Sequence, residues 1–250
     1  MIKPKSPREI ERMRAAGKIV AGVLERAQQM ARPGVALKEL DEEAERIIRA
    51  QGGKPLFKGY RGYPATICAS INEEVVHGIP GSRVLREGEI LSVDVGASLA
   101  GYGADAARTL PVGEVASDAL DLIEVCRVAL EKAIAAAKSG GRLSDISRAI
   151  QTHAESHGRS VVRTYTGHGI GRTMHEEPQI PNFVAPMFKL NDPVLRKGMT
   201  LAIEPMVNAG GHRVKTLDDG WTVVTEDGSL SAHFEDTVAV TDEGGDILTR

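Results

Sequence analysis

The stretch "REGEILSVD", from Arg86 to Asp94, returns as "RKGMTLAIE", from Arg196 to Glu204, and this repeat indicates the fold. Both copies follow the pattern Arg-x-Gly-x-x-Leu-x-(Val or Ile)-acid, the first starting at residue 86 and the second at residue 196, an offset of 110. The tripeptide "HGI" also occurs twice, at His77 and at His168. This period is far longer than that of solenoid repeats. The sequence therefore predicts two structurally similar halves that face each other around a pseudo-two-fold axis.

The first copy follows a pair of predicted helices. One helix has Ser6 as its N-cap, Pro7 in its first turn and Glu9 as the partner in a capping box, and it runs to the "RPG" break. Apolar residues at helical spacing from Leu37 predict a second helix, which ends at the glycine pair 52–53. The next segments, "ATICASI", "EILSVDVGAS" and "YGADAARTLPVG", are typical of β-strands. The predicted order is helix, helix, strands.

The same order starts again at Ser117. The segments "SDALDLIEVCRVALEKAIAAAKSGG" and "LSDISRAIQTHAESHG" predict two capped helices that end at glycine. They are followed by "SVVRTYTGHGIG", "KGMTLAIEPMV" and "SAHFEDTVAVT", which are β-like. A site on the axis between the two halves would take side chains from both.

Length, charge and cysteine content limit the class of protein. The 250 residues, 42% of them hydrophobic, are enough to bury a sizeable core in one large α/β unit. A net charge of −3 shows no basic excess, so neither a nucleic acid nor a membrane surface is the expected partner. Two cysteines cannot form a disulfide framework, and the start "MIKPKSPREI" has no signal-peptide core. We expect a soluble, cytoplasmic protein that binds a small molecule or a peptide.

The stretch "TGHGIGRTMHEEP", residues 166–178, has glycine at every second position over its first half. Glycines at this spacing weaken a helix or a strand, so we expect a loop close to a ligand. His168 and His175 then become candidate site residues. The neighbouring Glu176 and Glu177 are expected to be a solvated pair.

Four acidic residues stand in segments that should be largely buried. Asp94 and Glu204 end the two copies of the repeat, and Asp105 and Glu235 lie on the following strand-like segments. A single acid in such a place more commonly caps a turn or pairs with an arginine. His168 alone is equally weak evidence for a metal ligand. Four acids, two from each half, need a cation when they are buried together. With His168 as a nitrogen donor they predict a dinuclear metal centre.

Several motifs, in order, make the whole chain similar to the type I methionine aminopeptidases of the pita-bread fold. They are "INEEVVHGIP", "DVG" with "GYGADAART", "GHGIGRTMHEEPQIPNF", "KGMTLAIEPM" and "DGWTVVTEDGSLSAHFEDTVAVT". The resemblance implies an α/β (α+β) pita-bread fold, in which two pseudo-symmetric halves of helices pack on a mainly antiparallel sheet around a central dinuclear metal site. We expect one catalytic domain over residues 1–250, with halves at about 6–113 and 117–243.

The resemblance also implies roles for individual residues. Two divalent metal ions, Mn(II), Fe(II) or Co(II) with Zn(II) compatible, would be held by Asp94, Asp105, His168, Glu204 and Glu235, of which Asp105 and Glu235 bridge the ions. The catalytic residues would be His77, His175 and Glu204. In this scheme both His77 and His175 contact the substrate, and Glu204 takes a proton from a metal-activated water or hydroxide.

The implied activity is removal of the N-terminal methionine from peptides and nascent proteins whose second residue is small. The methionine pocket would be lined by Tyr60, Tyr63, Cys68, Met174 and Trp221. Two positions depart from the family pattern, because Phe57 replaces a cysteine of some bacterial relatives and Met174 replaces the usual phenylalanine. These changes bear on the shape of the pocket, since methionine is an adaptable side chain.

Two other classes share this framework. Proline-specific aminopeptidases and prolidases have the same metal-ligand pattern, but a sizeable domain precedes their catalytic domain, whereas Ser6 begins a catalytic-domain helix here. A non-enzymatic pita-bread module would have lost its ligands, and all five are present. We further expect a monomer with the ribosome as a candidate partner, and retention of Met1 because the bulky Ile2 follows it.

Overall fold

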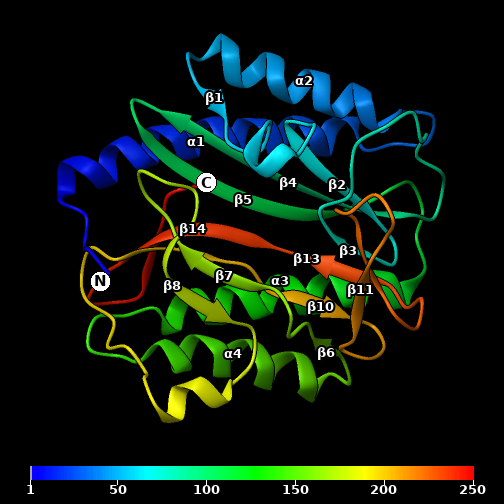
Figure 1. Ribbon diagram of the computed structural model, residues 1–250. Helices are drawn as coiled ribbons and strands as arrows, with labels where there is room; N and C mark the ends of the chain where they lie inside the picture. The colour runs from blue at the N-terminus through cyan, green and yellow to red at the C-terminus, as the bar shows by residue number, and fades with distance from the viewer. Residues whose placement is uncertain (1) are drawn as a thin grey trace.

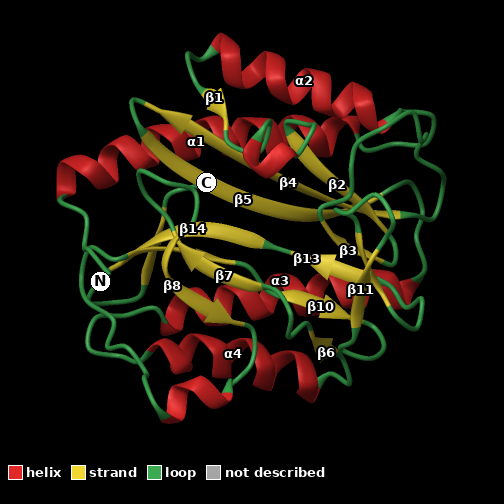
Figure 2. Cartoon of the chain, viewed as in Figure 1, coloured by secondary structure: helices red, strands yellow, loops and turns green. Residues whose placement is uncertain are grey.

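The computed structural model describes residues 2–250 as a curved β-sheet covered by two pairs of helices. Met1, for which we expect retention, lies outside the described residues. In Figure 1, α1 and α2 cover the end of the sheet that contains β4 and β5, and α3 and α4 lie at the opposite end. Figure 2 shows the same arrangement by type of structure, with the helices outside and the strands between them. The two helix pairs come from the two predicted halves.

Local signals set the ends of the first two helices. Helix α1 (Pro7–Met30) begins after Ser6, whose amide donates to Glu9 Oε2 at 2.9 Å, and this pair forms the predicted capping box. Helix α2 (Leu37–Ala50) begins in the same way, since the Ala36 amide donates to Glu39 Oε1 at 3.0 Å. Both predicted helices are confirmed.

The helices of the second half repeat this pattern. Helix α3 (Ser117–Ala136) buries Leu122, Cys126 and Leu130 on one face. Helix α4 (Leu143–Ser156) starts where the Arg142 amide donates to Asp145 Oδ2 at 2.8 Å. The 3₁₀ turns η1 (Tyr60–Gly62) and η2 (Pro186–Lys189) complete the helical structure that the described residues contain.

The main sheet joins the two halves through β5 and β14. Its strand order is β1-β4-β5-β14-β9-β7-β8, with β2 paired to β4 and β15 paired to β14, and all of these pairs are antiparallel. The bounds are β1 (Lys54–Pro55), β2 (Ile67–Ile71), β4 (Ile90–Leu99), β5 (Tyr102–Pro111), β7 (Thr166–Gly169), β8 (Glu176–Pro181), β9 (Thr200–Ile203), β14 (Glu235–Val240) and β15 (Gly245–Ile247).

Two small antiparallel sheets flank the main one. The first has the order β13-β10-β6, from β6 (Ser160–Val161), β10 (Met206–Asn208) and β13 (Ser231–His233). The second has the order β11-β12-β3, from β3 (Glu74–Val76), β11 (Val214–Thr216) and β12 (Val223–Thr225). It therefore pairs strands of both halves.

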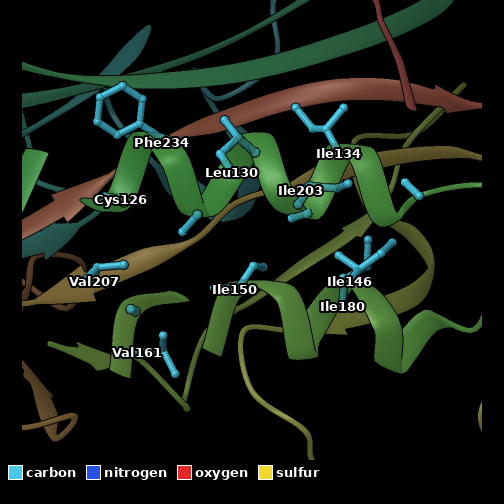
Figure 3. Close-up of a cluster of buried hydrophobic side chains, with 14 of the residues drawn as sticks. Cys126, Leu130, Ile134, Ile146, Ile150, Val161, Ile180, Ile203, Val207 and Phe234 are labelled. Carbon is cyan, nitrogen blue, oxygen red and sulfur yellow. The ribbon is translucent and has the colours of Figure 1, made fainter. Parts of the chain in front are cut away.

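The core lies between the helices and one face of the main sheet. Side chains of a strand alternate between faces, so Val93 and Val95 of β4 point toward α1 and α2, in one buried cluster with them. A second cluster packs α3 and α4 on Leu201 and Ile203 of β9 (Figure 3). The residues between these core positions face away from the helices, where a site can form.

The stretch 166–178 differs from its prediction as a loop, because only residues 170–175 lie outside strands. Thr166–Gly169 forms β7 and pairs with both β8 and β9. Its glycines are required by close strand packing. A Cβ at Gly167 would lie 2.5 Å from Ala202 O, and one at Gly169 would overlap the Glu177 carbonyl.

Gly17 gives a stability prediction with a matched control. A Cβ at this position in α1 would overlap the Leu248 carbonyl, so Gly17→Ala should lower the free energy of unfolding by about 1–3 kcal/mol. Gly22 lies in the same helix, but the atom nearest to a Cβ added at Gly22 is Gln51 Nε2, at 3.9 Å. Gly22→Ala should instead stabilise the protein by about 0.5–1 kcal/mol, since alanine favours a helix. Chemical denaturation of both variants checks the signs, and equal effects would contradict the close contact at Gly17.

Candidate metal centre and active site

The strand register places three of the predicted acidic ligands on one face of the main sheet. In the β4–β5 pair, Asp94 lies opposite Ala107 and Asp105 lies opposite Gly96. Glu235 of β14 lies opposite the same Ala107 from the other side. Paired residues share a face and so do residues two apart in one strand, so all three carboxylates point away from the helices.

The same rule brings the remaining two ligands to this face. His168 lies opposite Ala202 of β9, and Ala202 lies opposite Thr237 of β14, two residues after Glu235. Glu204 comes two residues after Ala202, just beyond the end of β9. Each half thus supplies part of the cluster, as the repeat in the sequence predicts.

The distances show a compact group. Ligand atoms of Asp105, His168 and Glu235 all lie within 4.8 Å of one another, and all three residues are buried. Glu204 Oε1 is 3.6 Å from His168 Nε2. These residues and Asp94 line a cavity of about 620 Å³, which also contains the two other predicted histidines and the predicted pocket residues: His77, His175, Tyr60, Tyr63, Cys68, Met174 and Trp221.

The carboxyl groups of the cluster disfavour one another's charge. Burial raises the pKa of Asp105 to about 7. Burial, followed by the nearby Asp105 charge, also raises the pKa of Asp94, of Glu204 and of Glu235. Within residues 2–250, Arg61 is the one lysine or arginine that lines the cavity, and its guanidinium lies 5.4 Å from the Tyr60 ring centre. No lysine or arginine in the described part of the chain forms an ion pair with the four carboxylates of the cluster.

The unpaired atoms of the cluster fit a metal site. Among residues 2–250, Asp94 Oδ1, Asp105 Oδ1 and Glu235 Oε1 are buried without a hydrogen-bond partner. Four carboxylates and one imidazole form an oxygen-rich donor set that suits divalent transition metals. Bound cations would neutralise the charge of the carboxylates and coordinate their unpaired oxygen atoms.

His168 has the proton arrangement of a metal ligand. Its Nδ1 lies 2.9 Å from Gly169 O, so a proton on Nδ1 donates to that carbonyl and leaves the Nε2 lone pair free. Burial, with a smaller effect of His175, lowers the pKa of His168 to about 4, and the ring is therefore neutral at neutral pH. Nε2 faces Glu204 within the cluster.

His77 and His175 lie beside the cluster and are held by aromatic neighbours. The Tyr60 hydroxyl lies 2.8 Å from His175 Nδ1, and the His175 ring centre is 4.3 Å from that of His168. His77 has a φ of 62° and stands edge-on to Tyr165, with ring centres 5.5 Å apart. Burial lowers the pKa of both histidines, that of His77 to about 4. Both are neutral hydrogen-bonding groups.

The predicted methionine pocket forms a small apolar cluster next to the acids. Phe57, Tyr63, Ala65, Cys68 and Met174 are buried together, and Tyr60 and Trp221 pack on them. Tyr63 and Trp221 meet edge to face with ring centres 5.0 Å apart. Phe57 and Met174, the two predicted departures from the family pattern, are members of this cluster.

Sequence reasoning missed His233. This residue is buried in the cavity, its Nε2 lies 3.8 Å from Glu204 Oε2, and that nitrogen has no hydrogen-bond partner within residues 2–250. Burial lowers the pKa of His233 to about 3. A signal was present in "SAHFED", because His233 precedes Glu235 by two residues in an extended segment.

The fold and the site define a metal-dependent hydrolase whose centre is shared between two similar halves, and comparisons with known proteins give its family. Residues 11–242 match the model of metallopeptidase family M24. The chain is 55% identical to methionine aminopeptidase 1 of Bacillus subtilis, over all of both chains. This chain belongs to metallopeptidase family M24.

Solved structures agree with this assignment. The methionine aminopeptidase of Thermotoga maritima superposes with a TM-score of 0.96 at 49% identity, over all of both chains. The prolidase of Pyrococcus furiosus superposes with a TM-score of 0.80 at 22% identity, over 99% of this chain and 65% of the prolidase, and this likeness shows the fold alone. The predicted fold and family are confirmed. Within residues 2–250, no helix combines the length and the apolar character that a membrane crossing requires.

Proposed function

We propose that this chain removes the N-terminal methionine from peptides and nascent proteins when the second residue is small. One observation carries the proposal: the apolar side chains of Tyr63, Cys68, Met174 and Trp221 line the same cavity as the acidic cluster. Support comes from the 55% identity to a methionine aminopeptidase over the full chain. The predicted single catalytic domain over residues 1–250 is part of this proposal.

We assign the binding of two divalent metal ions to Asp94, Asp105, His168, Glu204 and Glu235, with Mn(II), Fe(II) and Co(II) favoured and Zn(II) compatible. Support comes from the ligand atoms of Asp105, His168 and Glu235, which all lie within 4.8 Å of one another. Such ions, when bound, lower the pKa of a coordinated water and polarise a carbonyl group. The orphaned oxygens of the cluster support this assignment.

The protein's own groups then orient the peptide and move protons. Glu204, whose Oε1 lies 3.6 Å from His168 Nε2, would be the base that accepts a proton from the attacking water. His175 donates a hydrogen bond from Nε2 to the scissile peptide group, because Tyr60 can donate to Nδ1 and so place the ring proton on Nε2. His77, which lines the same cavity, would also contact the substrate, and the apolar side chains would hold the methionine side chain.

A prolidase is the alternative enzyme, since it shares this fold. The chain is 22% identical to the Pyrococcus furiosus prolidase and 55% identical to the Bacillus subtilis methionine aminopeptidase. This difference favours methionine aminopeptidase activity. The presence of all five acidic and histidine ligands argues against a binding module without catalysis. The predicted monomeric state, cytoplasmic location and contact with the ribosome stay predictions.

Purified protein supplied with Mn(II), Co(II) or Fe(II) should release free methionine from Met-Ala-x or Met-Gly-x peptides. Removal of the metal by a chelator should abolish release, and added metal should restore it, because the proposed nucleophile depends on the ions. An x-Pro peptide serves as the control for prolidase activity. Absence of methionine release with every one of these metals would falsify the proposal, and preference for x-Pro would favour the alternative.

A further inference from the structure

The loop between β7 and β8 is held by Glu176, which was expected to be solvated. This loop, residues 170–175, carries Met174 and His175 into the cavity. Glu176 Oε1 accepts a hydrogen bond of 2.9 Å from the Arg172 amide and a longer one of 3.4 Å from the Thr173 amide. The Glu176 carboxylate, which follows the loop directly in sequence, therefore fixes the backbone of residues 172 and 173.

The other oxygen of this carboxylate pairs with a residue from the start of the chain. Lys5 Nζ lies 2.7 Å from Glu176 Oε2, and the two side chains are only 10% and 25% exposed. The Lys5 backbone is fixed as well, since its amide donates to Gly198 O at 2.6 Å. A shielded ion pair with an anchored backbone is stronger than an ordinary surface pair.

Two glycines provide the space for Lys5. A Cβ at Gly171 would lie 2.5 Å from Lys5 Cε and 2.6 Å from Glu176 Oε1. A Cβ at Gly198 would lie 2.7 Å from Lys5 O, and Gly198 also has a φ of +85°. The N-terminal segment thus passes between two glycine positions of the second half, one of which belongs to the loop itself.

We propose that Lys5 is a positioning residue, which acts through Glu176 to hold Met174 and His175 in place for the substrate. This inference rests on the proposed function, because it concerns the same peptide site. Without Lys5, the partly shielded Glu176 carboxylate loses its cation and turns toward water, and the amides of residues 172 and 173 lose their acceptor. The metal ligand His168 is held separately, by the pairing of β7 with β9.

The test compares Lys5→Met with Lys5→Arg and with Lys3→Met as the matched control, since Lys3 is exposed and has the same chemistry two residues away. With a Met-Ala-x peptide, Lys5→Met should lower kcat/KM by about tenfold or more, with part of the loss in kcat, because misplacement by about 1 Å is costly in catalysis. Lys5→Arg should restore most of the activity. Lys3→Met should match the wild type, and bound metal should stay unchanged in all variants.

Limited proteolysis reports on the loop without turnover. Trypsin should cut after the exposed Arg172 several times faster in Lys5→Met than in the wild type, while cutting after Lys189, on η2, stays the same as an internal reference. Glu176→Gln keeps the size of the side chain but removes the ion pair, so it should show the same effects, and the double variant should be little worse than either single one.

Full kcat/KM in Lys5→Met would overturn the proposal, and so would equal cutting after Arg172 in Lys5→Met and Lys3→Met. A loss of activity that follows a loss of metal would also contradict it. If the wild type itself released no methionine, the proposed function would fail, and the rate of cutting after Arg172 would still decide whether Lys5 holds the loop.

Discussion

His168→Ala is expected to lose bound metal and activity together, whereas His175→Ala keeps the metal and loses about a hundredfold or more in rate. The first change deletes a proposed ligand of the ions. Its effect on metal affinity should exceed the roughly 10–100-fold that is typical when an outer partner of a ligand is lost. The second change deletes the proposed hydrogen bond from His175 to the scissile peptide group, which would strengthen in the transition state. Metal content after desalting, measured beside the rate with Met-Ala-x, separates the two.

The geometry explains why two neighbouring imidazoles should behave differently. Their ring centres are only 4.3 Å apart, but their hydrogen-bond partners differ. His168 can use Nδ1 toward Gly169 O and present Nε2 to the acids, whereas His175 Nδ1 faces the Tyr60 hydroxyl at the pocket wall. His157→Ala, an exposed histidine at the end of α4, is the control and should change neither property. If His175→Ala emptied the site while His168→Ala kept both ions, the two roles would be reversed.

The helices and the two halves could be predicted because their signals are local. Ser6 and Glu9 are three residues apart and form the capping box that the sequence shows. The repeat that ends in Asp94 and Glu204 marks corresponding strands of the two halves. Acids in apolar strands are unusual enough to indicate a site, since their burial without a cation is costly. The cluster then follows from the pairing of β5 with β14.

The remaining features depend on partners that are distant in the sequence. Gly167 was interpreted as a loop residue, because nothing nearby shows that the Ala202 carbonyl of a neighbouring strand occupies the place of its Cβ. Glu176 was expected in solvent, but its cation, Lys5, lies 171 residues earlier. His233 contacts the cluster only because its segment runs beside Glu204. Such contacts are fixed by tertiary packing, and local patterns do not reveal them.

The second large effect concerns the residue after the scissile bond. We expect a Met-Ile peptide to be cleaved more than a hundredfold more slowly than Met-Ala, which corresponds to a clash of about 3 kcal/mol. His77 and His175 would face this residue, and both rings have aromatic neighbours that limit their movement. His77 is enclosed edge-on by Tyr165 and by Trp221, with ring centres 5.5 Å and 6.4 Å away, and His175 is held by the Tyr60 hydroxyl. A β-branched side chain carries two heavy atoms on Cβ and is stiff at χ1, so it cannot turn aside.

The comparison of kcat/KM for Met-Ile and Met-Ala peptides of equal length measures this effect, with Met-Gly as a second small substrate that should resemble Met-Ala. Phe57→Cys provides a control on the other side of the bond, since Phe57 packs in the methionine pocket with Tyr63 and Cys68. This variant should change the rates for both peptides by a similar factor and leave their ratio intact, because the ratio is set around the two histidines. Equal rates on Met-Ile and Met-Ala would contradict the steric explanation of the preference for a small second residue.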